Sequence, residues 1–210
     1  MNYQPFRDPP AWFHTRILVG PGVYLTPVFQ ITRNISHVIN CAYPLDSPAW
    51  FRNKFPERYE CMFAPDSPNA DIRDWLPHFE RTMHQFLREG NGVVYVHCAA
   101  GMNRSATLAL AYVCKNFHFP MDAMIQTTLR QRPCMYQNPV YMNQVRELIN
   151  GRVQSAQNPG GTLRSDERGD ARLHASGGRS GTQGLDVDSG QIEVRTGQSP
   201  GKELGTLCEE

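Results

Sequence analysis

The sequence lacks several features that would place it in common protein classes. Its 210 residues hold no apolar run of 18 or more, so no transmembrane helix is expected. The start, MNYQPFRDPPAW, has no apolar stretch behind a basic end and is not typical of a secretory signal. A net charge of +1 argues against a broad basic surface for wrapping duplex nucleic acid. We therefore expect a soluble intracellular protein of the cytoplasm or nucleus.

The cysteines and histidines lack the spacing of metal or disulfide sites. The six cysteines include no CxxC pair, which disfavours both a zinc site and a disulfide framework. Cys41, Cys61 and Cys114 lie in apolar runs and are expected to be small buried hydrophobic residues. We predict no metal and no cofactor.

Aromatic residues are absent from the last quarter of the chain. Residues 156–210 contain no Phe, Tyr or Trp, and they hold 11 of the 17 glycines. Such a segment cannot bury enough apolar surface to offset the entropy lost on ordering. We predict one folded domain over residues 1–152 and a disordered tail rich in Gly, Ser and Asp over residues 153–210.

The folded part shows mixed α and β patterns. Helical spacing of apolar residues covers 72–87 and 105–116, and Asn138-Pro139 is typical of the start of a last helix that stops before Gly151. Short β-branched or aromatic runs predict strands at 23–25, 37–40, 59–63 and 93–97. These elements predict an α/β fold with a small central mixed sheet flanked by helices.

The most informative stretch is VVYVHCAAGMNRSAT, from Val93 to Thr107. A strand ends at His97, a short loop containing Gly101 follows, and an apolar helix begins at once. A bare Cys-x5-Arg would be weak, since chance gives roughly half a match in this composition. The strand, loop and helix context makes it specific.

The loop has the chemistry of an anion site. Backbone N–H groups between a strand end and a helix N-terminus can cradle a phosphate and favour a thiolate at Cys98. Arg104 can fork onto two phosphate oxygens, and Ser105 can hydrogen-bond the sulfur. His97 is expected to orient the loop and support the thiolate. The candidate substrate-binding residues are Ala99, Ala100, Gly101, Met102, Asn103 and Arg104.

The segment HCAAGMNRS resembles the phosphate-binding loop, HCxxGxxRS, of the cysteine-dependent protein tyrosine phosphatase superfamily. The resemblance covers most of residues 20–150 and extends to the strand at 36–40 and to Arg132-Pro133 followed by Asn138. It implies a protein tyrosine phosphatase-like fold, with Asn40 and Asn138 supporting the loop.

A general acid should lie on a loop over the pocket. Asp66 follows a strand, precedes a helix, and lies five residues before Asp71-Ile72, which resembles the dual-specificity pattern. Asp71 and Asp74 fit the first turn of the helix better, although Asp71 stays the fallback acid. Asp46 is a further upstream carboxylate.

The resemblance implies a dual-specificity protein phosphatase, which dephosphorylates phosphotyrosine and phosphoserine or phosphothreonine in proteins. Cys98 would attack phosphorus and form a cysteinyl-phosphate, Asp66 would protonate the leaving oxygen, and Asp66 would then activate water. The expected partner is a phosphorylated protein; the sequence indicates no oligomeric state.

Two alternatives stay open. Asn103 before the arginine resembles RNA 5′-triphosphatases of the same superfamily, under which nucleic acid would be the substrate. A phosphate-binding pseudophosphatase is the other. The loop lacks lysine, which disfavours polyphosphorylated lipids. No segment resembles a tyrosine-recognition loop, so we expect a shallow pocket.

Overall fold

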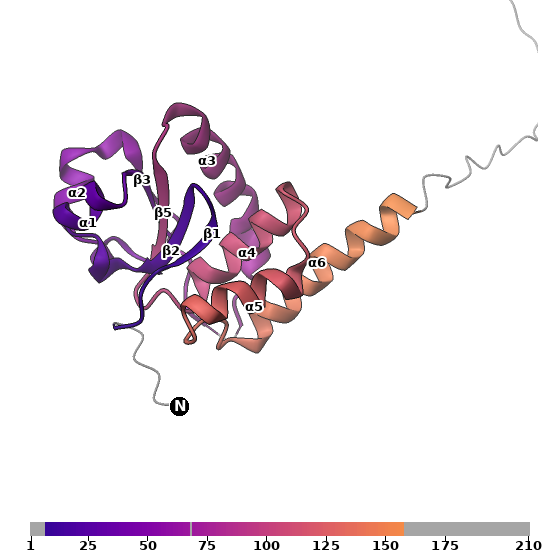
Figure 1. The fold of residues 1–210 in the computed structure, drawn as a ribbon. Helices are drawn as coiled ribbons and strands as arrows, with labels where there is room; N and C mark the ends of the chain where they lie inside the picture. Colours follow the sequence, from indigo (N-terminus) through magenta and orange to yellow (C-terminus); the bar gives the residue numbers. More distant parts are fainter. Residues whose placement is uncertain (1–6, 68, 158–210) are drawn as a thin grey trace, which may run out of the picture. The chain divides into compact units, whose positions relative to one another are not determined.

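A five-stranded sheet lies at the centre of the fold in the computed structural model, which describes residues 7–67 and 69–157 (Figure 1). The strand order is β1-β2-β5-β3-β4. β1 pairs antiparallel with β2 and the other pairs are parallel, so the sheet is mixed, as the sequence predicts. The strands are β1 (Ala11–His14), β2 (Ile17–Pro21), β3 (Ile35–Asn40), β4 (Tyr59–Cys61) and β5 (Val93–Cys98).

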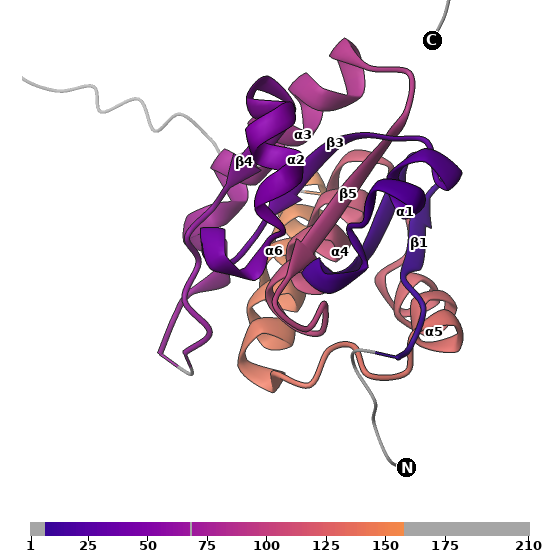
Figure 2. The same cartoon turned by 90° about the vertical axis from the view of Figure 1, so that its left-hand side faces the viewer.

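Helices cover both faces of the sheet. Figures 1 and 2 show α1 and α2 on one face and α3, α4, α5 and α6 on the other. Their bounds are α1 (Pro27–Thr32), α2 (Ala49–Lys54), α3 (Leu76–Glu89), α4 (Arg104–Asn116), α5 (Met121–Gln131) and α6 (Pro139–Gln157). Within the described residues, no helix is long and apolar enough to cross a membrane.

The central strand and the helix that follows it form the core. Every residue of β5 is buried, and Arg104 to Cys114 of α4 are buried as well. Alternate side chains of β5 pack into the two apolar clusters on opposite faces, with Val94 and Val96 on the α4 side and Val93 and Tyr95 on the α1 side. The loop that joins β5 to α4 is therefore held between two buried elements.

The parallel register brings three strand ends to one edge. Pro21 of β2 pairs with Cys98, and Asn40 of β3 pairs with His97. In open α/β sheets ligands bind outside the carboxyl ends of the strands. The loops after β2, β3 and β5 therefore meet where the motif residues lie.

Two local predictions are wrong. Residues 23–25 do not form a strand: Gly22–Tyr24 is a short 3-10 helix, and the strand is Ile17–Pro21, whose apolar residues are the ones that pair with β5. The last helix does not stop before Gly151 but continues to Gln157, because an exposed glycine costs a helix only about 1 kcal/mol. The tail predicted from residue 153 lies, beyond Gln157, outside the described residues.

Candidate active site

Cys98 is the last residue of β5 and lies beneath the loop that leads to α4. The residue is 2% exposed, while Ala99 and Ala100 beside it are partly exposed. Ser105, in the first turn of α4, donates a hydrogen bond from Oγ to the sulfur over 3.3 Å. The structure thus brings these two predicted residues together in the expected contact.

Buried Arg132 holds the outer side of the loop. Its guanidinium donates from Nη2 to the Ala100 carbonyl over 2.7 Å and from Nε to the Gly101 carbonyl over 3.1 Å. The Tyr136 amide donates to the Met102 carbonyl over 2.9 Å. In a trans peptide the N–H points opposite to the C=O, so the amides that follow these carbonyls face the inner side of the loop. That is the arrangement of an anion cradle.

Gly101 is required by the path of the loop. Its φ is +63°, in the left-handed region that favours glycine. A Cβ added there would lie 2.2 Å from the Gly20 carbonyl carbon, which belongs to the neighbouring strand β2. Both the backbone conformation and the close approach to β2 therefore exclude a side chain.

Arg104 follows the loop and is almost completely buried. Its Nη1 donates to the Ala64 carbonyl over 3.0 Å, and its Nη2 lies 3.5 Å from a carboxylate oxygen of Asp66. The Asp66 side chain is 47% exposed. Tyr141 of α6 anchors the loop on both sides of this aspartate, since its hydroxyl donates to the Pro65 carbonyl over 3.0 Å and approaches the Ser67 carbonyl at 3.4 Å.

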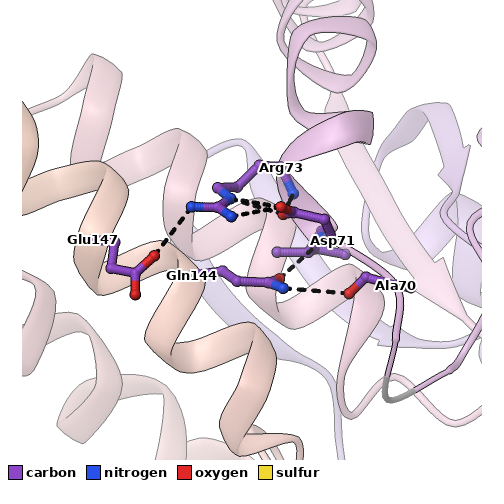
Figure 3. A network of polar contacts seen from close by, with 6 residues as sticks. Ala70, Asp71, Arg73, Gln144 and Glu147 are labelled. Carbon is purple, nitrogen blue, oxygen red and sulfur yellow. Dashed lines mark hydrogen bonds and ion pairs between the residues drawn. The ribbon is translucent and has the colours of Figure 1, made fainter.

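Asp71, the fallback acid, belongs to a separate polar network (Figure 3). Its carboxylate accepts from the Arg73 amide over 2.9 Å and pairs with the Arg73 guanidinium at 2.6 Å. Arg73 also reaches Glu147 of α6, at 3.1 Å. Hydrogen bonding to Arg73 lowers the pKa of Asp71, which disfavours the protonated form that a general acid needs. Asp66, by contrast, lies beside Arg104 at the loop after β5.

Asn103 and Asn138 tie the loop to α6. The Asn103 side-chain oxygen accepts a hydrogen bond from the Asn138 amide over 3.0 Å. The Asn138 side chain caps α6 by accepting from the amides of Val140 and Tyr141 over 3.0 and 3.3 Å. Asn138 therefore contacts the loop through its backbone, and its side chain starts the helix, as the Asn-Pro pattern predicts.

The Asn40 side chain forms hydrogen bonds within the turn that follows β3. Its side chain accepts from the Ala42 amide over 2.9 Å and donates to the Tyr43 carbonyl over 2.7 Å. The turn touches the motif through the Cys41 amide, which donates to the His97 carbonyl over 2.7 Å. Asn40 is therefore linked to β5 through this turn.

His97 is fully buried and contacts the backbone beside the sulfur. Its Nδ1 lies 3.3 Å from the Cys98 carbonyl oxygen, and its Nε2 lies 3.1 Å from Ser47 Oγ. Because a carbonyl only accepts, Nδ1 carries the proton and Nε2 accepts from the serine, which describes a neutral ring. Burial lowers the pKa of His97 from 6.5 to about 4. His97 thus positions the backbone as a neutral group.

The other cysteines fit the expectation of buried hydrophobic residues in two cases of three. Cys41 and Cys114 are buried, whereas Cys61 is partly exposed. Burial raises the pKa of Cys114 to about 11. Within the part of the chain that the structure describes, no three His, Cys, Asp or Glu side chains are grouped to hold a metal ion.

Three residues of the site escaped the sequence analysis as site residues: Arg132, Ser47 and Tyr141. Each acts from a distant part of the sequence on the backbone or on a buried histidine. Only Arg132 carried a signal, because Arg132-Pro133 is part of the family resemblance.

Comparison with known proteins gives one family match. The family described as "Dual specificity phosphatase, catalytic domain" matches residues 19–150. Among curated proteins, a probable dual specificity protein phosphatase of Dictyostelium discoideum is 28% identical over 133 residues, covering 61% of this chain and 33% of that protein. Dual specificity protein phosphatase 22-B of Danio rerio is 32% identical over 99 residues, covering 46% of this chain and 52% of that protein. The chain therefore spans about half or less of these relatives.

Solved structures share the fold. A mouse putative dual specificity phosphatase, crystallised with zinc tungstate, has a TM-score of 0.59 at 21% identity, covering 75% of this chain and 93% of that one. A human tyrosine phosphatase-like serine/threonine/tyrosine-interacting protein has a TM-score of 0.55 at 20% identity, covering 70% and 99%. At these identities the likeness shows the fold alone.

The close approach of Gly101 to β2 predicts a strong response to one methyl group. Gly101→Ala should lower the free energy of unfolding by about 2 kcal/mol or more, because the Cβ meets backbone atoms in a conformation unfavourable for alanine. Denaturant unfolding measures the change. Gly151→Ala is the matched control: among the described residues, no atom outside its own stretch of helix lies within 4 Å of the added carbon, and in a helix it should raise stability by roughly 0.5–1 kcal/mol. Equal effects of the two substitutions would contradict the argument.

The buried neutral His97 predicts a pH dependence of stability. Because its pKa is lowered from 6.5 to about 4, the unfolded chain binds the proton more tightly. The contribution of neutral His97 to the free energy of unfolding is therefore complete above about pH 6.5. It decreases as pH falls toward 4, by about 3 kcal/mol in total. His97→Asn should remove this part of the pH dependence in unfolding experiments from pH 7 to 4. The exposed His118→Asn should retain it, and an unchanged slope in His97→Asn would refute the assignment.

Proposed function

The chain belongs to the dual specificity phosphatase family, and on that premise we propose that it dephosphorylates tyrosine, serine and threonine residues of proteins through a cysteinyl-phosphate intermediate. The observation that carries the proposal is the junction of β5 and α4. There a serine hydroxyl donates to the Cys98 sulfur, and the buried Arg104 begins α4 directly after the loop. A phosphorylated protein is the proposed partner.

The first step is attack of the Cys98 thiolate on phosphorus. An S–P bond forms, the P–O bond to the substrate breaks, and Asp66 gives its proton to the leaving oxygen. Arg104 and the loop amides stabilise the charge on the phosphoryl oxygens. Among the described residues, Arg104 Nε is a buried donor with no protein acceptor, so a phosphate oxygen would satisfy it.

The second step returns the enzyme to its starting state. Asp66, now a carboxylate, takes a proton from water, and the resulting nucleophile breaks the S–P bond to release inorganic phosphate. The Ser105 hydroxyl, 3.3 Å from the sulfur, stabilises the departing thiolate. Neither step needs a metal or a cofactor, since the charge is met by Arg104 and the amides.

The two alternatives, an RNA 5′-triphosphatase and a pseudophosphatase, receive less support. The Asn103 side chain, whose resemblance raised the RNA 5′-triphosphatase hypothesis, accepts a hydrogen bond from the Asn138 amide, so the fold itself provides a reason for asparagine there. A pseudophosphatase would not require Cys98, Arg104 and Asp66 together, and this chain has all three.

The mechanism predicts distinct losses for distinct substitutions. Cys98→Ser should abolish hydrolysis of phosphotyrosine and phosphothreonine peptides, because the hydroxyl is a far weaker nucleophile. Asp66→Ala should lower kcat by about 100-fold or more, which is the usual contribution of a general acid. A plot of wild-type kcat against pH should be bell-shaped. In Asp66→Ala, the decrease of kcat at high pH should disappear. Steady-state kinetics on the two peptides measures each effect.

The controls separate the proposal from its alternatives. Asp71→Ala should change kcat far less than Asp66→Ala, since Asp71 is paired with Arg73. EDTA should leave activity unchanged. Faster release of phosphate from 5′-triphosphate RNA than from either peptide would replace the proposal with the triphosphatase. Activity that survives Cys98→Ser and is lost with EDTA would contradict the mechanism.

A further inference from the structure

Three exposed apolar side chains are carried by the segments that follow β3 and β4, the second of which leads to Asp66. Leu45 is 95% exposed, Phe63 is 56% exposed and Tyr43 is 45% exposed. The rings of Tyr43 and Phe63 meet edge to face, with centroids 6.4 Å apart. We call these three residues the apolar rim. Exposed apolar side chains on segments that lead to a site for a charged group are available to contact an apolar part of a ligand.

The backbone under the rim is continuous with the catalytic groups. Phe63 directly precedes Ala64, whose carbonyl accepts from Arg104 Nη1 over 3.0 Å. The Phe63 amide donates to the Ala42 carbonyl over 3.0 Å, which joins the two halves of the rim. The Tyr43 carbonyl is held by the Asn40 side chain over 2.7 Å. The exposed side chains are therefore carried by a backbone that is fixed on the site.

The conformation of Phe63 adds an independent observation. Its φ is +55°, in the left-handed region, which is unusual for an aromatic residue. Asparagine or glycine would adopt this conformation with less strain. The backbone therefore gives no reason for a phenyl ring at this position, and the ring, half exposed, is not accounted for by the core. Strained residues of this kind cluster at ligand sites.

We propose that the apolar rim binds an aliphatic or aromatic side chain next to the phosphorylated residue of the protein substrate, and so selects phosphorylated sites with apolar neighbours. The inference rests on the proposed phosphatase function, because it places the phosphorylated residue at Cys98. The phosphate would be held by Arg104 and the loop amides, and the adjacent apolar side chain would cover the exposed surfaces of Phe63, Tyr43 and Leu45.

The test compares two phosphotyrosine peptides that differ only in having leucine or serine on both sides of the phosphotyrosine. The wild type should prefer the leucine peptide by roughly tenfold in kcat/KM, which is the discrimination that an apolar contact supplies. The double variant Leu45→Ser/Phe63→Asn should bring this ratio close to parity. Its melting temperature should not fall, because asparagine tolerates the left-handed conformation at position 63.

A matched control removes exposed apolar surface elsewhere. Val28→Ser/Ile31→Ser changes two side chains of α1 that are 71% and 73% exposed, and it should keep the preference of the wild type. A wild-type ratio near parity would overturn the proposal, as would an unchanged ratio in the rim variant. Sedimentation gives a further outcome that would overturn the proposal. If the wild type is a dimer, the rim variant is a monomer and the peptide ratio is the same in both, the rim binds a second copy of the chain instead of the substrate.

Para-nitrophenyl phosphate, which has no neighbouring residues, separates this proposal from the function on which it rests. If the wild type hydrolyses neither this compound nor the peptides, the phosphatase function fails. The rim is then judged by the affinities of the two peptides for the wild type, and equal affinities would overturn it as well.

Discussion

The candidate active site depends on the buried guanidinium of Arg132, which fixes the backbone orientation of the loop between β5 and α4. The carbonyls of the loop after β5 have to face away from any bound anion, and those of Ala100 and Gly101 do so because Arg132 binds both. Arg132 is fully buried, so these hydrogen bonds form where water competes little. Without such a donor, the carbonyls would be left unsatisfied or would rotate inward, and either change would disrupt an anion cradle.

The sheet register explains how residues from distant parts of the sequence reach this loop. The carboxyl ends of β2, β3 and β5 lie at one edge, so the turns after them come together. Gly101 has no side chain and so can approach the backbone of Gly20 in β2, and Ser47 after β3 binds His97. The loop after β4, which carries Asp66, contacts Arg104 through the Ala64 carbonyl. In each of these contacts at least one of the two partners is backbone or a small side chain, which allows the turns to pack closely.

The central strand, the loop and the helix could be predicted from the sequence because their signals are local. A β-branched run, a glycine and an apolar helix follow one another between Val93 and Asn116. The contacts that hold the loop are not local: Arg132 lies 32 residues from Ala100, and Ser47 lies 50 residues from His97. The strand wrongly predicted at 23–25 also reflects a non-local contact. Ile17–Pro21 is the segment that pairs with β5, and the apolar residues after it form a short 3-10 helix. Spatial partners of this kind leave no periodic trace in one sequence.

Tyr141, Gln144 and Glu147 lie at three-residue intervals along α6, and all three hold the segment that carries Asp66 and Asp71. Tyr141 binds the Pro65 carbonyl, Gln144 accepts from the Ile72 amide over 2.9 Å, and Glu147 pairs with Arg73. Three-residue spacing keeps these side chains on one helical face. The position of the segment that carries Asp66 therefore depends on the rotation of α6 about its own axis. One residue inserted between Tyr141 and Gln144 would turn the later contacts by about 100°, uncoupling them from the loop while the apolar content of the helix stayed the same.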